Sequence, residues 1–168
     1  PTTSQPAYKD FINKYSYLSS HYNSTIGIHL SKAFSGTFSN SQRAAKAVSE
    51  QSGKEISVIN SNRISSALGL TVLRAAEAIE QGQSHQQIVS AVESWNDKNH
   101  ILVSAKTVKY LVKSGRLSHS KGVIGKLLGV KPIISVDNQG KAITFGKAFS
   151  EKGSMNQLIK VASELVEK

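Results

Sequence analysis

The segment from Thr25 to Val48 most constrains how this chain folds, because its residue pattern changes from that of a strand to that of a helix. Residues 25–30 carry β-branched side chains in alternation with small or polar ones, which predicts a strand. From about Phe38 onward, alanines and a valine recur at the spacing of one helix face. The sequence therefore predicts a strand that passes through a short turn into a helix.

The turn between this strand and this helix is Phe34-Ser-Gly-Thr-Phe38, which is rich in hydroxyl groups. The first N–H groups of a helix lack partners within it, and the helix dipole places partial positive charge there. Ser35, Gly36 and Thr37 therefore form a candidate anion-binding site, in which the glycine allows a close backbone approach. A serine or threonine in this place also commonly caps the helix, and the two interpretations are compatible.

Apolar periodicity predicts the remaining elements. Helices are expected at residues 7–20, 67–80, 85–96, 107–114, 122–128 and 155–166, and strands at residues 55–59, 100–104, 131–136 and 141–149. The residues expected to face the core are Leu70, Leu73, Ala76 and Ile79 in the helix at 67–80, and Met155, Leu158, Ile159, Ala162, Leu165 and Val166 in the last helix.

The order of these elements predicts the fold class. Strands alternate with helices over the first hundred residues, which is typical of a parallel sheet covered by helices. The last two strands flank a hairpin turn at residues 137–140 and are followed by a helix. We expect an α/β lobe at residues 1–104 and part of a second α+β lobe at residues 105–168.

Composition excludes several classes of protein. The 168 residues contain no cysteine, so disulfides and thiolate metal sites are excluded, and a reducing cytoplasm is compatible with this. No apolar run is long enough to span a membrane, and no signal-peptide pattern is present. The five histidines show no metal-ligand spacing, so no metal is expected. Neither a dinucleotide-binding glycine motif nor a phosphate-binding loop motif occurs, and no cofactor is expected.

The formal net charge of +10 is concentrated in one stretch. Residues 105–131 contain seven basic residues and no acid: Lys106, Lys109, Lys113, Arg116, Lys121, Lys126 and Lys131. Such a stretch favours a docking surface for an acidic partner, or a nucleic-acid-binding module. Aromatic residues other than Tyr110 are missing from it, which argues against single-stranded nucleic acid.

An enzyme that binds phosphate through the Ser35 loop is another alternative, with His29 as its base. His29 lies near the end of the predicted strand, close in sequence to Ser35. No second catalytic group is evident, and a histidine at a strand end commonly has a purely structural hydrogen bond. We therefore expect a binding protein and no catalytic residue.

Four segments, taken in order, resemble the DegV family of bacterial lipid-binding proteins. They are Thr3-Ser-Gln-Pro6, the region 29–41 with Ser35-Gly-Thr-Phe38, Ala67-Leu-Gly-Leu-Thr-Val72, and Tyr110-Leu-Val-Lys-Ser-Gly-Arg-Leu117, which continues into Leu127-Leu-Gly-Val-Lys-Pro-Ile133. Each segment alone is weak evidence, whereas their order and spacing over nearly the whole chain are specific.

This resemblance implies a long-chain fatty acid bound between two lobes. It also implies a role as the fatty-acid-binding subunit of a bacterial fatty acid kinase, which presents the acid to a separate kinase subunit. By position, Thr3 and Ser35 would hold the carboxylate beside the Gly36 and Thr37 amides, and Arg116 would meet the kinase. The residues expected to line the acyl tunnel are Ile28, Phe34, Phe38, Leu128, Ile133, Ile134 and Phe145.

The chain also departs from the family pattern. It resembles a member truncated at both ends, without the opening strand and its Asp-Ser-Thr turn and without a late histidine near the carboxylate. Where many members carry arginines after the hairpin, this chain has Ala148-Phe-Ser-Glu151. These differences bear on how the carboxylate is held and which acyl chain is preferred.

Overall fold

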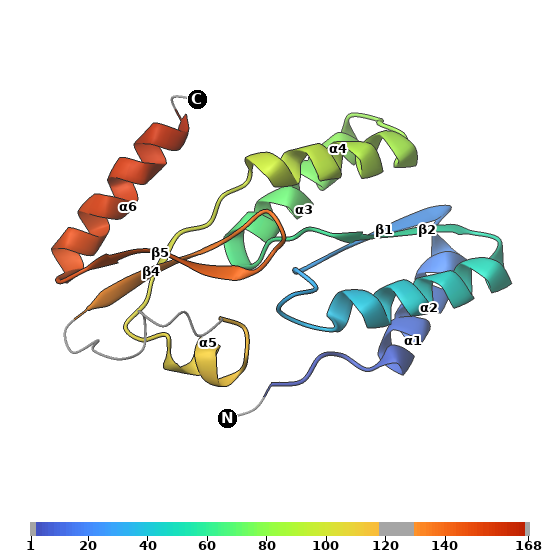
Figure 1. The fold of residues 1–168 in the computed structure, drawn as a ribbon. Coiled ribbons are helices and arrows are strands. Elements are labelled where there is room, and N and C mark those ends of the chain that lie inside the picture. Colours follow the sequence, from blue (N-terminus) through green and yellow to red (C-terminus); the bar gives the residue numbers. More distant parts are fainter. Residues whose placement is uncertain (1–2, 118–129, 167–168) are drawn as a thin grey trace. The chain divides into compact units, whose positions relative to one another are not determined.

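The computed structural model describes residues 3–117 and 130–166 (Figure 1). The helix expected at residues 122–128 and the predicted tunnel residue Leu128 lie outside this range. Contacts divide the chain into two units, Pro1–Asn99 and His100–Lys168. Within the described residues, no helix is both long and apolar enough to cross a membrane.

The first unit contains four helices and two strands among its described residues. In chain order they are α1 (Tyr8–His21), β1 (Ser24–His29), α2 (Thr37–Ser52), β2 (Glu55–Asn60), α3 (Ser65–Glu80) and α4 (His85–Lys98). The two strands pair in parallel, with Ser24 opposite Glu55 and His29 opposite Asn60. The predicted strand, turn and helix at residues 25–48 are confirmed, and so is a parallel sheet in this part of the chain.

Helices cover both faces of this sheet, because successive side chains of a strand point to opposite faces. Ile56 and Val58 of β2 pack against a cluster of α1 and α2 residues that includes Tyr15 and Ala45. On the other face, Ile59 belongs to a second cluster formed mainly by α3 and α4, which Ile26 and Ile28 of β1 join. Figure 1 shows α1 and α2 on one side of the strands and α3 and α4 on the other.

Helix α3 turns a different face inward from the one that its apolar residues predict. The buried residues are Ala67, Thr71, Ala75 and Ala78. Leu70, Leu73 and Ile79 are 53%, 54% and 60% exposed, and Ala76 is exposed as well, so the expectation for this helix was wrong.

Thr71 accounts for much of this orientation. Its hydroxyl is fully buried and accepts from Asn99 Nδ2 at 2.8 Å, and its single hydrogen is shared between Ala67 O at 3.2 Å and Asn96 Oδ1 at 3.3 Å. A stripe of alanines with one threonine also lets α3 approach its neighbours closely. Buried hydrogen bonds and small side chains therefore fix the rotation of α3.

The second unit consists, in its described part, of β3 (Val103–Ser104), α5 (Lys109–Lys113), β4 (Lys131–Val136), β5 (Ala142–Ala148) and α6 (Glu151–Val166). The strands form an antiparallel sheet in the order β3-β4-β5. Of the strand expected at residues 100–104, Val103 and Ser104 form β3 and pair with β4, within the unit His100–Lys168.

Helix α6 also differs from its predicted orientation. Met155, Ile159 and Leu165 are 56%, 57% and 37% exposed, and Ala162 is exposed, whereas Leu158 is half-buried. Burial is described for residues 151–165 of this helix, so the expectation for Val166 lies outside that range, and the buried residue among them is Ser154, whose hydroxyl donates to Ser104 Oγ at 2.7 Å. A serine pair therefore joins α6 to β3, and most of the predicted apolar stripe faces outward.

Candidate functional site

The carboxyl ends of β1 and β2 place two loops side by side. His29 O at the end of β1 accepts from Ser61 N at 3.0 Å, and Ser31 N donates to Arg63 O at 2.9 Å. Asn60 at the end of β2 accepts from Lys32 N through its side chain at 3.1 Å. Ligands of parallel α/β sheets commonly bind at this edge of the sheet. The Ser35 loop is part of this edge.

The Ser35 loop is closed by hydroxyl hydrogen bonds at the start of α2. Ser35 Oγ accepts from Thr37 N at 3.2 Å and lies 2.8 Å from Thr37 Oγ1. Ser35 therefore satisfies one amide at the helix start, as a cap would. Their mutual bond uses one of the two hydroxyl hydrogens, and because both residues are partly exposed, the other hydrogen can be donated to a ligand.

The N-terminal segment is docked on the same loop. Gly36 N donates to Gln5 Oε1 at 2.9 Å, and Asn40 Nδ2 donates to Pro6 O at 3.0 Å. Thr3, which is exposed, precedes these anchored residues by two positions. The structure thus joins the segment that carries Thr3 to the loop of Ser35 and Thr37, while the Gly36 amide is engaged by a protein acceptor.

His29 belongs to a separate hydrogen-bonded chain on the α1 and α2 side of the sheet. Its Nε2 lies 2.6 Å from Ser41 Oγ, and its ring meets that of Phe11 edge-on at 5.5 Å. Burial lowers the pKa of His29 below its ordinary value of 6.5. No hydrogen bond joins His29 to Ser35 in the described parts of the chain, so the geometry lends no support to His29 as the base of a Ser35-loop enzyme.

The loop after β2 holds a buried arginine that the sequence interpretation overlooked. Arg63 is 3% exposed and donates to Asn99 O at 2.6 Å and to Asn96 O near the end of α4. Its cation therefore meets the negative end of a helix dipole. Flanking Asn62 and Ser65 both have φ of 51°, a left-handed conformation that non-glycine residues rarely adopt.

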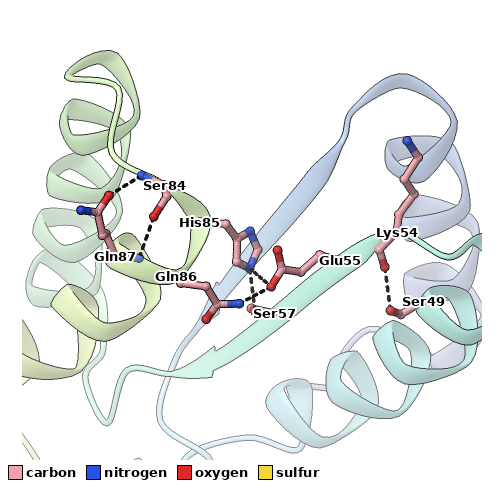
Figure 2. A network of polar contacts seen from close by, with 8 residues as sticks. All are labelled: Ser49, Lys54, Glu55, Ser57, Ser84, His85, Gln86 and Gln87. Carbon is pink, nitrogen blue, oxygen red and sulfur yellow. Dashed lines mark hydrogen bonds and ion pairs between the residues drawn. The ribbon is translucent and has the colours of Figure 1, made fainter.

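Another polar network ties α4 to the opposite end of β2 (Figure 2). His85 Nε2 lies 2.7 Å from Ser57 Oγ and 3.7 Å from Glu55 Oε1, and Gln86 also donates to Glu55. Figure 2 shows these side chains converging on β2, beside the Ser84 and Gln87 capping box of α4. This network lies at the amino end of the strand, away from the Ser35 loop, and it fixes the start of α4.

An apolar groove of about 590 Å³ runs between β1 and α3. Ile26 and Ile28 line it from the strand, and Val72 and Ile79 line it from the helix. Ile28 is the predicted tunnel residue that contributes to it. No residue of the Ser35 loop lines this groove.

The other predicted tunnel residues lie in both units. Phe34 and Phe38 are half-buried in the first unit beside Ser35. Ile133 and Ile134 are buried in β4, whereas Phe145 of β5 is 46% exposed. Their assignment to an acyl tunnel stays a prediction.

The predicted docking residue Arg116 follows a left-handed glycine at the end of α5. Gly115 has φ of 71°, and Arg116 N donates to Leu111 O at 2.9 Å. The neighbouring Lys106, Lys109 and Lys113 are exposed. Lys131 differs from these, because its Nζ lies 3.4 Å from Glu151 Oε1. Among the residues described, no cluster of side chains could hold a metal ion.

Comparison with known proteins identifies the family. The family model described as "Uncharacterised protein, DegV family" matches residues 1–168. The chain belongs to the DegV family. A DegV domain-containing protein of Streptococcus pyogenes is 31% identical over 167 residues, which cover 99% of this chain and 58% of that relative. The chain thus spans little more than half the length of the curated DegV relatives that it matches.

Solved DegV structures share the fold. A fatty-acid-binding DegV family protein from Thermus thermophilus has a TM-score of 0.89 and 29% identity, over 99% of this chain and 58% of that protein. DegV of Bacillus subtilis, described as a fatty acid binding protein, has a TM-score of 0.82 and 32% identity, over 98% of this chain and 57% of its own. The α/β fold with a parallel sheet and the family membership predicted from the sequence are therefore confirmed.

Proposed function

We propose that this protein binds a long-chain fatty acid and presents its carboxylate to a separate kinase subunit, which forms the acyl phosphate. The observation that carries this proposal is the docking of the Thr3 segment onto the Ser35 loop through Gln5 and Asn40. This arrangement brings the segment that carries Thr3 to the helix start where Ser35 and Thr37 lie. Support also comes from the Thermus and Bacillus DegV proteins, which are described as binding fatty acids.

The proposed anchor consists of the Thr3, Ser35 and Thr37 hydroxyls. A carboxylate accepts hydrogen bonds only, and bonds from neutral donors to a charged acceptor contribute about 1.5–3 kcal/mol each. Ser35 and Thr37 stand at the start of the 16-residue helix α2, whose dipole favours a negative charge. A bound carboxylate would replace the Ser35–Thr37 hydroxyl bond, so that both of these hydroxyls donate to it together with Thr3.

A carrier role fits these residues better than catalysis. In the described part of the chain, the one histidine near the loop in sequence is bonded to buried Ser41. Chemistry on the bound carboxylate would therefore depend on a second protein. Arg116 and the exposed lysines of residues 106–113 are the proposed meeting surface for that protein, since they form the basic part of the second unit.

Native mass spectrometry of the purified protein tests the proposal. We expect the protein to carry an added mass that matches a fatty acid, and to gain one on mixing with stearate or oleate. The fatty alcohol of the same length is the matched control, because it keeps the acyl chain and lacks the charge. Equal binding of acid and alcohol would contradict the carboxylate anchor, and binding of neither would contradict the proposed function.

A further inference from the structure

The Gln5 side chain lies directly against the backbone of Gly36. Gln5 Oε1 accepts from Gly36 N at 2.9 Å. A Cβ atom built on Gly36 would lie 2.6 Å from Gln5 Nε2 and 2.8 Å from Gln5 Cδ, which is closer than real Cβ contacts. An alanine at position 36 would therefore displace the Gln5 carboxamide from its place beside the backbone, although the φ of −74° at Gly36 is open to any residue.

Further contacts hold the residues that follow Gln5. Asn40 Nδ2 donates to Pro6 O at 3.0 Å, and the Arg43 guanidinium lies 5.0 Å from the centre of the Tyr8 ring. Asn40 and Arg43 both belong to α2, so this segment follows the first turns of that helix. Thr3, by contrast, makes no hydrogen bond with a described residue, and the nearest anchor to it is Gln5.

We propose that Gln5 is a positioning residue for the carboxylate site. It takes the Gly36 amide as its own partner and thereby holds the Thr3 hydroxyl within reach of a ligand bound at Ser35. Two residues of chain span at most about 7 Å, so a fixed Gln5 keeps Thr3 close to the loop that Gln5 contacts. The inference rests on the proposed function, because it assigns Gln5 a part in fatty-acid binding.

This inference changes the expected donor set of the site. The Gly36 amide donates to Gln5 and not to the ligand, which is held by the Thr3, Ser35 and Thr37 hydroxyls. Preorganisation of this kind raises affinity, because the ordering cost of the segment is met before the ligand arrives. Loss of the Gln5 bond should then weaken binding although Gln5 itself donates nothing to the ligand.

The test compares Gln5→Ala, Gly36→Ala and the double variant with wild type. Two quantities are measured: hydrogen exchange at the Gly36 amide, and the Kd for stearate. Gln5→Ala should speed hydrogen exchange at the Gly36 amide and leave Tm nearly unchanged. It should raise the Kd for stearate about two- to tenfold, which corresponds to the net contribution of one hydrogen bond. Gly36→Ala should expel the Gln5 carboxamide and raise the Kd for stearate about as much as Gln5→Ala does. The Kd of the double variant should not exceed that of the weaker-binding single variant.

Two more variants make the test specific. Gln42→Ala on the exposed face of α2 removes the same side chain elsewhere and should change neither quantity. Gln5→Glu keeps an acceptor for Gly36 N, so it should restore slow exchange, while its negative charge weakens binding of the acid.

Three results would overturn the inference or its basis. Unchanged exchange at Gly36 in Gln5→Ala would remove the contact on which the proposal depends. Faster exchange with unchanged Kd would make Gln5 a structural residue only. If wild type binds neither stearate nor oleate, the proposed function fails, and the exchange data still decide whether Gln5 anchors the segment.

Discussion

The hydroxyl oxygen of Tyr15 lies 2.6 Å from the Oγ of Ser41, and His29 Nε2 lies 2.6 Å from the same Oγ. Ser41 is fully buried, so it links α1, β1 and α2 away from water. Because a serine hydroxyl carries one hydrogen, it donates to one of these neighbours and accepts from the other. Burial also raises the pKa of Tyr15 above 10.0, which keeps the phenol neutral.

The hydrogen-bonded side chains of Tyr15, Ser41 and His29 fit beside β1 because Gly27 has no side chain. A Cβ atom at Gly27 would lie 2.5 Å from the Tyr15 hydroxyl and 3.3 Å from His29 Nε2. Gly27→Ala should therefore lower the free energy of unfolding by about 1–3 kcal/mol, as overpacking does. Combination with Tyr15→Phe removes the clashing oxygen, so urea melts should give the double variant a smaller loss than the sum of the single losses.

Gly69→Ala is the matched control for this substitution. A Cβ atom at Gly69, within α3, meets nothing within 4 Å. Replacement there should stabilise the protein by roughly 0.5–1 kcal/mol, since alanine favours a helix more than glycine does. A similar loss at both glycines would show that the Tyr15 contact does not decide the outcome.

The protonation of His29 should make stability depend on pH. Its pKa is lowered by burial below 6.5, so between the folded pKa and 6.5 the unfolded state binds more protons. The free energy of unfolding should therefore fall as the pH falls through that window, and should be independent of His29 above it. The groups that contact the ring, Phe11 and Ser41, carry no charge that could offset this effect.

Urea melts between pH 5 and 8 would measure this dependence. His29→Gln removes the titrating ring and should flatten the acid side of the profile. If the free energy of unfolding falls equally at acid pH in wild type and His29→Gln, other groups cause the pH dependence.

The sequence predicted those parts of the fold that depend on local pattern. The strand, the hydroxyl turn and the start of the helix emerged within a residue of their predicted positions, because β-branched residues, one glycine and a row of alanines act locally, whereas the helix continues to Ser52. The orientation of α3 did not follow from its pattern. Leu70, Leu73 and Ile79 form a more apolar stripe than Ala67 and Thr71, and only the tertiary bonds of Thr71 with Asn96 and Asn99 decide between them.

The candidate site was predictable where it depends on local sequence pattern. Ser35 and Thr37 stand out as hydroxyls at a predicted helix start. The role of Gln5 depends on a bond to Gly36, 31 positions along the chain, and glutamine has no spacing signal that reveals such a contact. Arg63 was equally hidden, because its acceptors are backbone carbonyls of residues 96 and 99, which no side-chain pattern marks.

Ser35→Ala should separate ligand binding from capping. Loss of a hydrogen bond to a charged carboxylate corresponds to a Kd for stearate raised roughly ten- to a hundredfold. Because Ser35 Oγ also accepts from Thr37 N, the free energy of unfolding should fall by about 1 kcal/mol. Ser39→Ala, on an exposed position of α2, should change neither quantity. A lower Tm with unchanged Kd would leave Ser35 as a cap alone.

Arg116→Ala should slow acyl-phosphate formation by the kinase subunit while leaving stearate affinity nearly intact. Arg116 follows the left-handed turn at Gly115, beside exposed Lys109 and Lys113, so its cation adds to a basic surface. Attraction between opposite charges is screened over about 10 Å at 0.1 M salt, so raised salt should slow the wild-type reaction in the same direction. The variant should respond less to salt, because one interacting charge is gone.

Lys131→Ala provides the comparison for Arg116→Ala. Both substitutions remove one positive charge from the second unit, so together they separate the effect of net charge from that of a specific contact of Arg116. Equal slowing by both variants would point to net charge and not to a specific contact of Arg116. A rise in the Kd for stearate equal to the loss of kinase rate would move Arg116 from the docking surface into the ligand site.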